Sequence, residues 1–286
     1  MSGLKAGIIA CVGTFLLLYW DVLFKLIRDW KTDENYSHGF LIIPIALYLV
    51  YERRERLAVA PRRPSMIGLA AILCALGLLV AGTLGAELFL TRISLVIMIA
   101  GIVLFLFGPR PLRILAFPIA FLLLMIPLPS IVFNQIAFPL QLIASQFGES
   151  TLHLARIPVL REGNVIVLAN TTLEVAEACS GIRSLISLLT LGIVLGYFSD
   201  SRNWVRLIVA LSTIPVAIVA NGMRVAGTGV AAYHYGPEAA TGFLHTFSGW
   251  LVFVFAFAML FVIQRSIAWL VPPVPERASV SEVSAR

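Results

Sequence analysis

The sequence predicts an all-α polytopic membrane protein, with about eight transmembrane helices and a small extracytoplasmic insertion made of a β-hairpin and an interfacial helix. Of its 286 residues, 59% are hydrophobic and only 13% are charged, whereas soluble proteins average about 25% charged residues. The mean hydropathy is +0.95. The apolar residues form long runs, and arginines gather in the loops between them. The net charge of +6 is therefore attributed to membrane topology and not to nucleic-acid binding.

The first third of the chain contains four apolar runs. The first run is followed by Asp21 and Lys25 instead of a small-residue cleavage site, so we interpret it as a retained span and not as a signal peptide. The segment ERRERLAVAPRRP after the second run holds five arginines in thirteen residues. This density of positive charge predicts a cytoplasmic loop. The four expected spans are roughly 6–26, 40–51, 66–84 and 88–107.

The middle of the chain combines a proline-rich span with two segments that are not expected to cross. A fifth span is expected at about 114–130, where three prolines predict kinks. Residues 131–148 are apolar but interrupted by asparagine and glutamine, which favours an interfacial helix over a crossing. Residues 157–178 show short β-branched runs, some alternation, and turn residues at Glu-Gly-Asn and Asn-Thr-Thr, which indicates a small hairpin or meander. Its unpaired edges must stay out of lipid.

The last third of the chain contains three more apolar runs and a polar tail. The expected spans are 182–198, 206–222 and 247–264. Residues 1–270 are predicted to form a single integral membrane domain, and the Pro- and Ser-rich residues 271–286 a disordered cytoplasmic tail.

Three chemically reactive residues mark the ends of these last three spans. Cys179 precedes the sixth span, Arg224 follows the seventh, and His245 precedes the eighth. Consecutive spans alternate in direction, so these three ends share one membrane face. The basic turn at Arg202 and Arg206 marks the opposite face as cytoplasmic. We therefore expect the trio at the outer surface, near the lipid headgroups.

The trio is suited to acyl transfer. His245 can act as the base or as the ion-pair partner that converts the Cys179 thiol into a nucleophilic thiolate, and it can later protonate a leaving amine. Arg224 can stabilise the oxyanion of a tetrahedral intermediate, or hold a substrate carbonyl or carboxylate. Attack on an amide would give an enzyme thioester. Water would make the reaction a proteolysis, and an amine or hydroxyl acceptor would make it a transfer.

Neighbouring residues are candidates for supporting roles. Ser180 and Gly181 suit a helix start that exposes its backbone N–H groups beside the thiol, and such groups lower a cysteine pKa. Arg183 lies four residues after the cysteine, on the same helical face, where it would support the thiolate or bind lipid. Asn221, three residues before Arg224, would orient the guanidinium or cap the helix.

Each member of the trio also has a plain structural interpretation. Cys179 would be a small packing residue in a membrane helix. Arg224 would extend its charge toward lipid phosphates, and His245 would be a polar residue at the interface. His234, in the segment YHYG, is the rival base. It is expected in the middle of the polar, glycine-bearing loop between the seventh and eighth spans, further in sequence from a helix start.

Four segments of the sequence, taken together, carry a resemblance to a known family. They are ACSGIRSL at 178–185, NGMRV at 221–225, FLHTFSG at 243–249 and YSHGFL at 36–41. The chain is similar to the exosortase/archaeosortase family, in which the equivalents of Cys179, Arg224 and His245 form the proposed catalytic triad. The resemblance implies a membrane-embedded thiol protease or transpeptidase of the bacterial exosortase type, since archaeal relatives tend to have arginine in place of the histidine.

The resemblance also implies the substrates and the location. Substrates would be secreted proteins with a carboxy-terminal sorting signal, namely a PEP-CTERM-like motif, an apolar span and a basic end. The enzyme would lie in the bacterial inner membrane, with its active site on the periplasmic side. Tyr36 and His38 would help to shape a substrate groove, although Tyr36 also suits a plain interfacial anchor. Some members carry an added domain linked to exopolysaccharide export, and the subtype stays open.

Other functional classes remain open at this point. A small-molecule or lipid transporter or flippase would line its path with intramembrane polar residues, but the central spans hold few ionisable groups. A structural scaffold would make Cys179 incidental. Three cysteines without a CxxC pair argue against a zinc site and a disulfide framework, so no metal or cofactor is expected. Membrane lipids and an unidentified acceptor nucleophile are the remaining expected partners.

Overall fold

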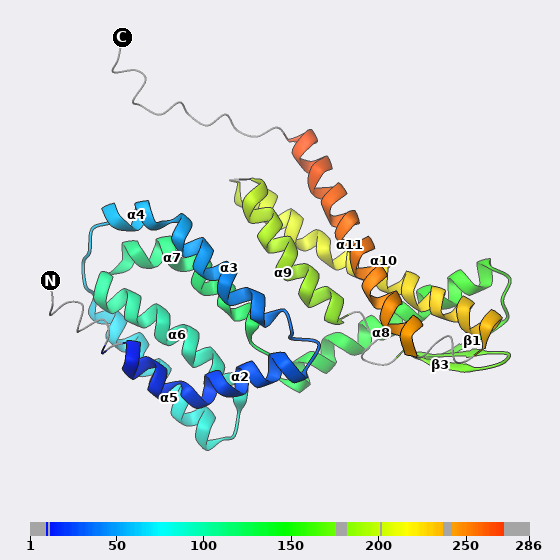
Figure 1. Ribbon diagram of the computed structural model, residues 1–286, viewed down its shortest axis with the longest axis horizontal. Coiled ribbons are helices and arrows are strands. Elements are labelled where there is room, and N and C mark those ends of the chain that lie inside the picture. Colours follow the sequence, from blue (N-terminus) through cyan, green and yellow to red (C-terminus); the bar gives the residue numbers. More distant parts are fainter. Residues whose placement is uncertain (1–9, 11, 176–181, 201, 237–241, 272–286) are drawn as a thin grey trace, which may run out of the picture. The chain divides into compact units, whose positions relative to one another are not determined.

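The computed structural model describes residue 10 and residues 12–175, 182–200, 202–236 and 242–271, without the side chains of 182 and 242–248. The chain divides into two compact units, residues 1–133 and 134–286, which are considered separately (Figure 1). Among the described residues, four helices are long and apolar enough to cross a membrane, or five if one bent pair counts as a single span. The protein is therefore a multi-pass membrane protein, and the structure supports four or five of the roughly eight expected spans.

The first unit is built from helices. They are α2 (Trp20–Thr32), α3 (Gly39–Glu52), α4 (Arg54–Val59), α5 (Met66–Leu84), α6 (Leu88–Phe107), α7 (Pro109–Phe121) and the short 3-10 helix η1 (Leu122–Met125). Helices α5 and α6 coincide with the predicted third and fourth spans and confirm them. Helix α3 is apolar but shorter than the helices that are long enough to cross a membrane.

Small residues let α5 and α6 pack as a close antiparallel pair (Figure 1). A Cβ added at Gly68 of α5 would lie 2.2 Å from the backbone nitrogen of Phe105. A Cβ added at Gly101 of α6 would lie 3.0 Å from the backbone nitrogen of Ile72. Lipid supplies no hydrophobic drive between helices, so this close approach is a main source of their attraction.

The chain bends by 79° between α7–η1 and α8 (Ser130–Leu154). The proline-rich break leaves backbone groups without helical partners, and such groups are costly near lipid. Two side chains of the first unit supply partners. Trp30 Nε1 donates to the Met125 carbonyl at 2.9 Å, and the Tyr36 hydroxyl accepts from the Leu128 N–H at 3.0 Å. Residues 131–148 lie within the helix α8, and their interfacial placement stays a prediction.

The second unit begins with α8 and an antiparallel sheet. Strands β1 (Val159–Glu162), β2 (Val165–Leu168) and β3 (Thr172–Glu174) pair in the order β1–β2–β3, which confirms the predicted meander. Gly163 turns the chain between β1 and β2 with a φ of +65°, a conformation that favours glycine.

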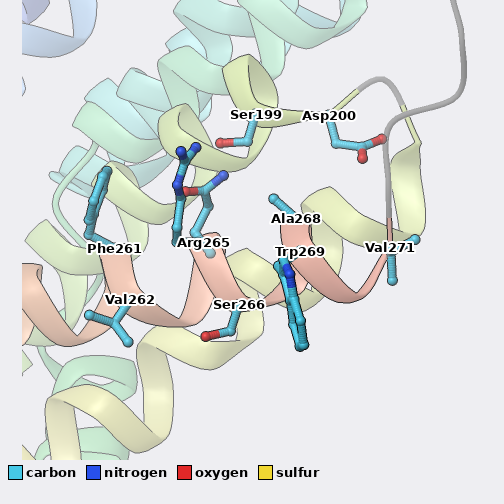
Figure 2. Close-up of a pocket in the computed structure, with 10 residues that line it drawn as sticks. Ser199, Asp200, Phe261, Val262, Arg265, Ser266, Ala268, Trp269 and Val271 are labelled. Carbon is cyan, nitrogen blue, oxygen red and sulfur yellow. The ribbon is translucent and has the colours of Figure 1, made fainter.

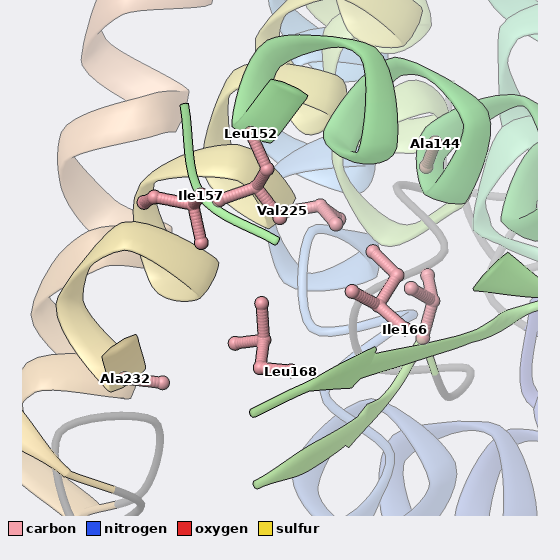
Figure 3. Packing of buried hydrophobic residues seen from close by; sticks show 8 residues of the cluster. Ala144, Leu152, Ile157, Ile166, Leu168, Val225 and Ala232 are labelled. Atoms are coloured by element: carbon pink, nitrogen blue, oxygen red, sulfur yellow. The ribbon is translucent and has the colours of Figure 1, made fainter. Parts of the chain in front are cut away.

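A buried apolar cluster joins the sheet to two helices (Figure 3). Ile166 and Leu168 point from one face of β2 toward α8 and α10 (Asn203–Tyr235). This cluster fixes the sheet against the helices. Its buried members are Ala144, Leu152, Ile157, Ile166, Leu168, Val175, Val225 and Ala232.

Helix α10 is longer than the sequence suggested. The seventh span was expected to end at residue 222, with a polar loop after it, but the helix continues without a break to Tyr235. Glycines explain the extension, because they bring α8 and α10 into direct contact. A Cβ at Gly148 would lie 2.7 Å from Val225 Cγ1, and one at Gly229 would lie 2.9 Å from Leu152 Cδ1. Packing on α8 therefore stabilises turns that the sequence alone did not mark as helical.

A second apolar cluster joins α10 to α9 (Ile182–Ser199) and α11 (Gly242–Leu270). All three helices contact one another. Helix α9 matches the predicted sixth span within one residue, and α11 contains the predicted eighth span. The buried members of this cluster are Leu188, Val216, Ala217, Ala220 and Ala256.

Candidate functional site

Arg224 lies inside α10, at the junction of the two apolar clusters. Ala220, one turn earlier, belongs to the cluster shared with α9 and α11. Val225, the next residue, belongs to the cluster shared with α8 and the sheet. Asn221 is 3% exposed and lies one turn before Arg224. Packing therefore fixes α10 just before and just after Arg224, and the Arg224 side chain itself is half-buried.

The Arg224 side chain reaches helix α11. A Cβ built on Gly249 would lie 3.3 Å from Arg224 Nη2 and 3.5 Å from Arg224 Cζ. His245 is the fourth residue of α11 and precedes Gly249 by one turn, so the two positions share a helical face. The structure thus brings Arg224 to the helix face that carries position 245. The His245 side chain lies outside the described residues.

Cys179, Ser180 and Gly181 also lie outside the described residues, between two anchored segments. On the amino-terminal side, Val175 is 2% exposed and belongs to the same buried cluster as Val225. Its N–H donates to the Asn164 carbonyl at 2.9 Å. On the carboxy-terminal side, Leu185 of α9 packs against the cluster that contains Ala220. The two segments that flank the cysteine are therefore packed against the same part of α10 that carries Arg224.

Arg183 is the second residue of α9. It is half-buried and interacts with other groups of the protein. It therefore lies at the same end of α9 as the segment that contains the cysteine. Its predicted support of a thiolate stays a prediction.

The rival base, His234, lies elsewhere on α10. It is ten residues beyond Arg224, or about 15 Å along the helix at 1.5 Å per residue. The side chain is exposed and its ring contacts Tyr233, with the ring centroids 5.1 Å apart. The prediction that it sits in the middle of a loop was wrong, because α10 extends past it. The described geometry brings Arg224 to α11 and not to His234.

The candidate site lies far along α10 and α11 from two other arginines of these helices, Arg206 and Arg265. Arg206 and Arg224 are about 27 Å apart along α10, and positions 245 and 265 are about 30 Å apart along α11. The hydrocarbon core of a bilayer is also about 30 Å thick. Arg224 and position 245 therefore lie roughly one hydrocarbon thickness away from Arg206 and Arg265.

A pocket of about 860 Å³ lies at that opposite end, between the last turns of α9 and α11 (Figure 2). Asp200 lines the pocket and is paired with Arg202. A hydrogen bond from the Arg202 side chain lowers the pKa of Asp200, and so does its charge. Arg265 and Trp269 also line the pocket. Among the described candidate residues, Arg183, Asn221 and Arg224 do not line this pocket.

Tyr36 and His38, the candidate groove residues, are placed in the first unit. Tyr36 is 4% exposed and holds the backbone at Leu128 through its hydroxyl. His38 Nε2 lies 3.2 Å from the Leu124 carbonyl. Both side chains therefore stabilise the proline-rich break after η1. A part in binding substrate stays a prediction.

The first unit should lose stability in acid through His38. Burial lowers the pKa of the His38 imidazole, although hydrogen bonds to the backbone at Leu124 and Asn35 oppose this. The folded protein then binds the proton less readily than the unfolded chain. The contribution of neutral His38 to the free energy of unfolding is fully present above the pKa of the unfolded chain, about 6.5. It is lost as the pH falls through the lower pKa of the folded protein.

We therefore expect the melting temperature in detergent to drop between about pH 7 and about pH 5, and His38→Gln to weaken this dependence. The control is His153→Gln, because His153 is exposed in the last turn of α8. Equal pH dependence in the wild type and His38→Gln would contradict the assignment.

Gly249 was not predicted from the sequence as a residue of the site. It appeared there only as the last letter of FLHTFSG. The signal that pointed to it was a glycine one turn after a candidate histidine inside an apolar helix. Among the described residues, no group of three or more His, Cys, Asp or Glu side chains is arranged to hold a metal ion.

Comparison with known proteins identifies the family. The sequence model described as transmembrane exosortase (Exosortase_EpsH) matches residues 30–262, which is most of the chain and includes all three candidate catalytic residues. The comparison with curated proteins found no match. The comparison with solved structures also found none. Because the match to the family covers far more than half of the sequence, the chain belongs to the transmembrane exosortase family.

Proposed function

We propose that this protein is a membrane-embedded cysteine protease or transpeptidase. In the proposal it cleaves the carboxy-terminal sorting signal of secreted proteins through a thioester and passes the acyl group to an acceptor. The exosortase family is known for processing PEP-CTERM proteins, and its members are generally considered cysteine transpeptidases. Family membership supports the reaction class. The packing around Arg224 supports the choice of residues.

The observation that carries the proposal is the convergence of packed segments on residues 220–225 of α10. Val175, before the cysteine, shares a cluster with Val225, and Leu185, after it, packs against the cluster of Ala220. Arg224 lies between Ala220 and Val225 and contacts Gly249, one turn from position 245. The described segments that flank Cys179, and the helix that carries position 245, thus pack against the stretch of α10 that carries Arg224, which supports the choice of the three residues.

The proposed reaction has two halves. His245 accepts the proton of the Cys179 thiol, and the thiolate sulfur attacks the carbonyl carbon of the scissile peptide. The Arg224 guanidinium donates hydrogen bonds to the resulting oxyanion. As the C–N bond breaks, the imidazolium protonates the leaving amine, which departs with the sorting signal. The acyl group stays on sulfur as a thioester. An amine, hydroxyl or water then attacks it, loses its proton to His245, and releases the thiol.

The proposed orientation places this site at the periplasmic face of the bacterial inner membrane. Helices α9, α10 and α11 would each cross the bilayer, as three of about eight crossings in total. Arg206 and Arg265 lie about one hydrocarbon thickness from Arg224 and position 245. Positive residues favour the cytoplasmic side, so the candidate site would face outward.

This location suits the proposed substrate. A secreted protein that ends in an apolar helix and a basic tail stays in the membrane after export, with its basic end inside. The motif before that helix then lies at the outer headgroup level, at the same depth as Arg224. An enzyme that holds its nucleophile at this depth can reach the motif without extracting the helix from lipid.

Trapping the thioester tests the proposal. Purified protein in detergent is mixed with a tagged substrate that carries a sorting signal, quenched in acid, and digested for mass spectrometry. We expect an acyl adduct on the peptide containing Cys179, and its release by neutral hydroxylamine. The same experiment with Cys74→Ala should give the same adduct, because Cys74 is an exposed cysteine of α5. Cleavage of substrate with no adduct on Cys179 would overturn the proposal.

A further inference from the structure

The contact between Arg224 and Gly249 has a defined geometry. A Cβ built on Gly249 would lie 3.3 Å from Nη2, 3.5 Å from Cζ and 3.7 Å from Nη1 of Arg224. Three nearly equal distances place the flat face of the guanidinium against α11. If the Cβ position at 249 lay in front of the two Nη atoms, in the plane of the guanidinium, its distance to Cζ would be clearly longer than its distances to both nitrogens. The edge that carries the N–H donors is therefore not directed at Gly249.

The same face of α11 continues in both directions from Gly249. Ala256 and Leu260, further along the helix, are fully buried, and Ala256 belongs to the cluster with α9 and α10. At about 100° per residue, position 245 lies about 20° from position 256 around the helix axis and one turn before position 249. Along this face of α11, Gly249 therefore lies between position 245 and Ala256, which belongs to the packed core of the three helices.

We infer that Gly249 is a positioning residue for Arg224, and this inference rests on the proposed function. With no side chain at 249, the flat face of the guanidinium lies against α11 one turn from position 245, and the edge that carries its N–H donors is directed away from Gly249. A Cβ at 3.3 Å from Nη2 is closer than nine in ten real Cβ contacts. A methyl group would move the guanidinium by a few tenths of an ångström, and a larger side chain would move it further. Catalytic hydrogen bonds are sensitive to displacements of this size.

The test compares Gly249→Ala and Gly249→Val with Gly227→Ala, measuring kcat and KM for cleavage of a substrate carrying a sorting signal. Gly227 is an exposed glycine of α10, and a Cβ there would meet nothing within 4 Å. We expect kcat to fall about tenfold for Gly249→Ala and about a hundredfold for Gly249→Val, with KM nearly unchanged. Gly227→Ala should behave like the wild type. Melting temperatures in detergent show whether each variant folds, and Gly249→Ala carries the test if Gly249→Val does not.

A double variant separates positioning from simple packing. In an Arg224→Ala background, Gly249→Ala should cause no further loss of kcat, because the group that it displaces is gone. Losses that multiply in the double variant, or wild-type kcat in Gly249→Ala, would overturn the inference. A fully active Arg224→Ala variant would instead overturn the role of Arg224 in the proposed function, so the two failures are distinguishable.

Discussion

Cells that produce the Cys179→Ala variant should accumulate uncleaved substrate, with cleavage reduced at least about a thousandfold. The thiol supplies the electron pair that forms the thioester, and neither Arg224 nor His245 replaces it in the proposed reaction. Cys179→Ser should be similarly inactive, because a hydroxyl is a much weaker nucleophile than a thiolate at neutral pH. The measurement is the ratio of cleaved to uncleaved tagged substrate on a gel, with membrane insertion of each variant verified.

Cys74→Ala is the matched control for this result. Cys74 is exposed in α5 of the first unit, so its loss should leave cleavage unchanged. The comparison also separates the functional classes that the sequence left open. A transporter, or a scaffold in which Cys179 is incidental, would tolerate the alanine. Normal cleavage by a correctly inserted Cys179→Ala protein would therefore eliminate the enzyme hypothesis.

The elements that the sequence predicted well are those whose signal is local. Helices α5 and α6 begin and end at the expected residues, because two apolar runs are separated by the short turn Gly85–Glu87 and Glu87 caps α6 through the Leu90 N–H. The sheet was predictable for the same reason. β2 is a short apolar run rich in β-branched residues, and turn residues stand at both of its ends.

The extension of α10 was not predictable because its cause is tertiary. The segment AGTGVAAYHY is rich in small and polar residues, which by themselves suggest a loop. In the structure those small residues form the surface that packs on α8, where Gly229 meets Leu152 and Ala232 is fully buried. The number of crossings was uncertain for a related reason. Helix α3 and residues 183–199 of α9 are apolar but short, so length and composition do not settle their path.

The sequence was enough to propose the residues of the candidate site, but not their geometry. Residue types and alternating spans were enough to select Arg224 and His245, and α10 and α11 now bring position 224 to the helix face of position 245. The role of Gly249 depends on the rotation of two helices about their axes. No local pattern encodes that rotation. It follows from the burial of Ala220 and Ala256 in one cluster.

The second large effect is expected at Arg224. Arg224→Ala should lower kcat for cleavage by about a hundredfold to a thousandfold, the usual cost of removing one oxyanion donor. Arg224→Lys should recover only part of this loss. An ammonium keeps the positive charge but lacks the planar fork, and it does not lie flat against Gly249 as the guanidinium does. KM should change less than kcat, since the oxyanion exists only in the transition state and the intermediate.

Arg206→Ala is the matched control, because Arg206 lies on the same helix at the opposite end. Its Nε donates to the Asp200 carbonyl at 2.6 Å, and its guanidinium stacks over the Tyr197 ring at 4.5 Å. Its loss should lower the melting temperature in detergent and leave kcat unchanged. If Arg224 only anchored α10 to lipid phosphates, the two variants would behave alike, with reduced stability and normal turnover. A selective loss of kcat in Arg224→Ala therefore requires that the guanidinium act on the reacting groups.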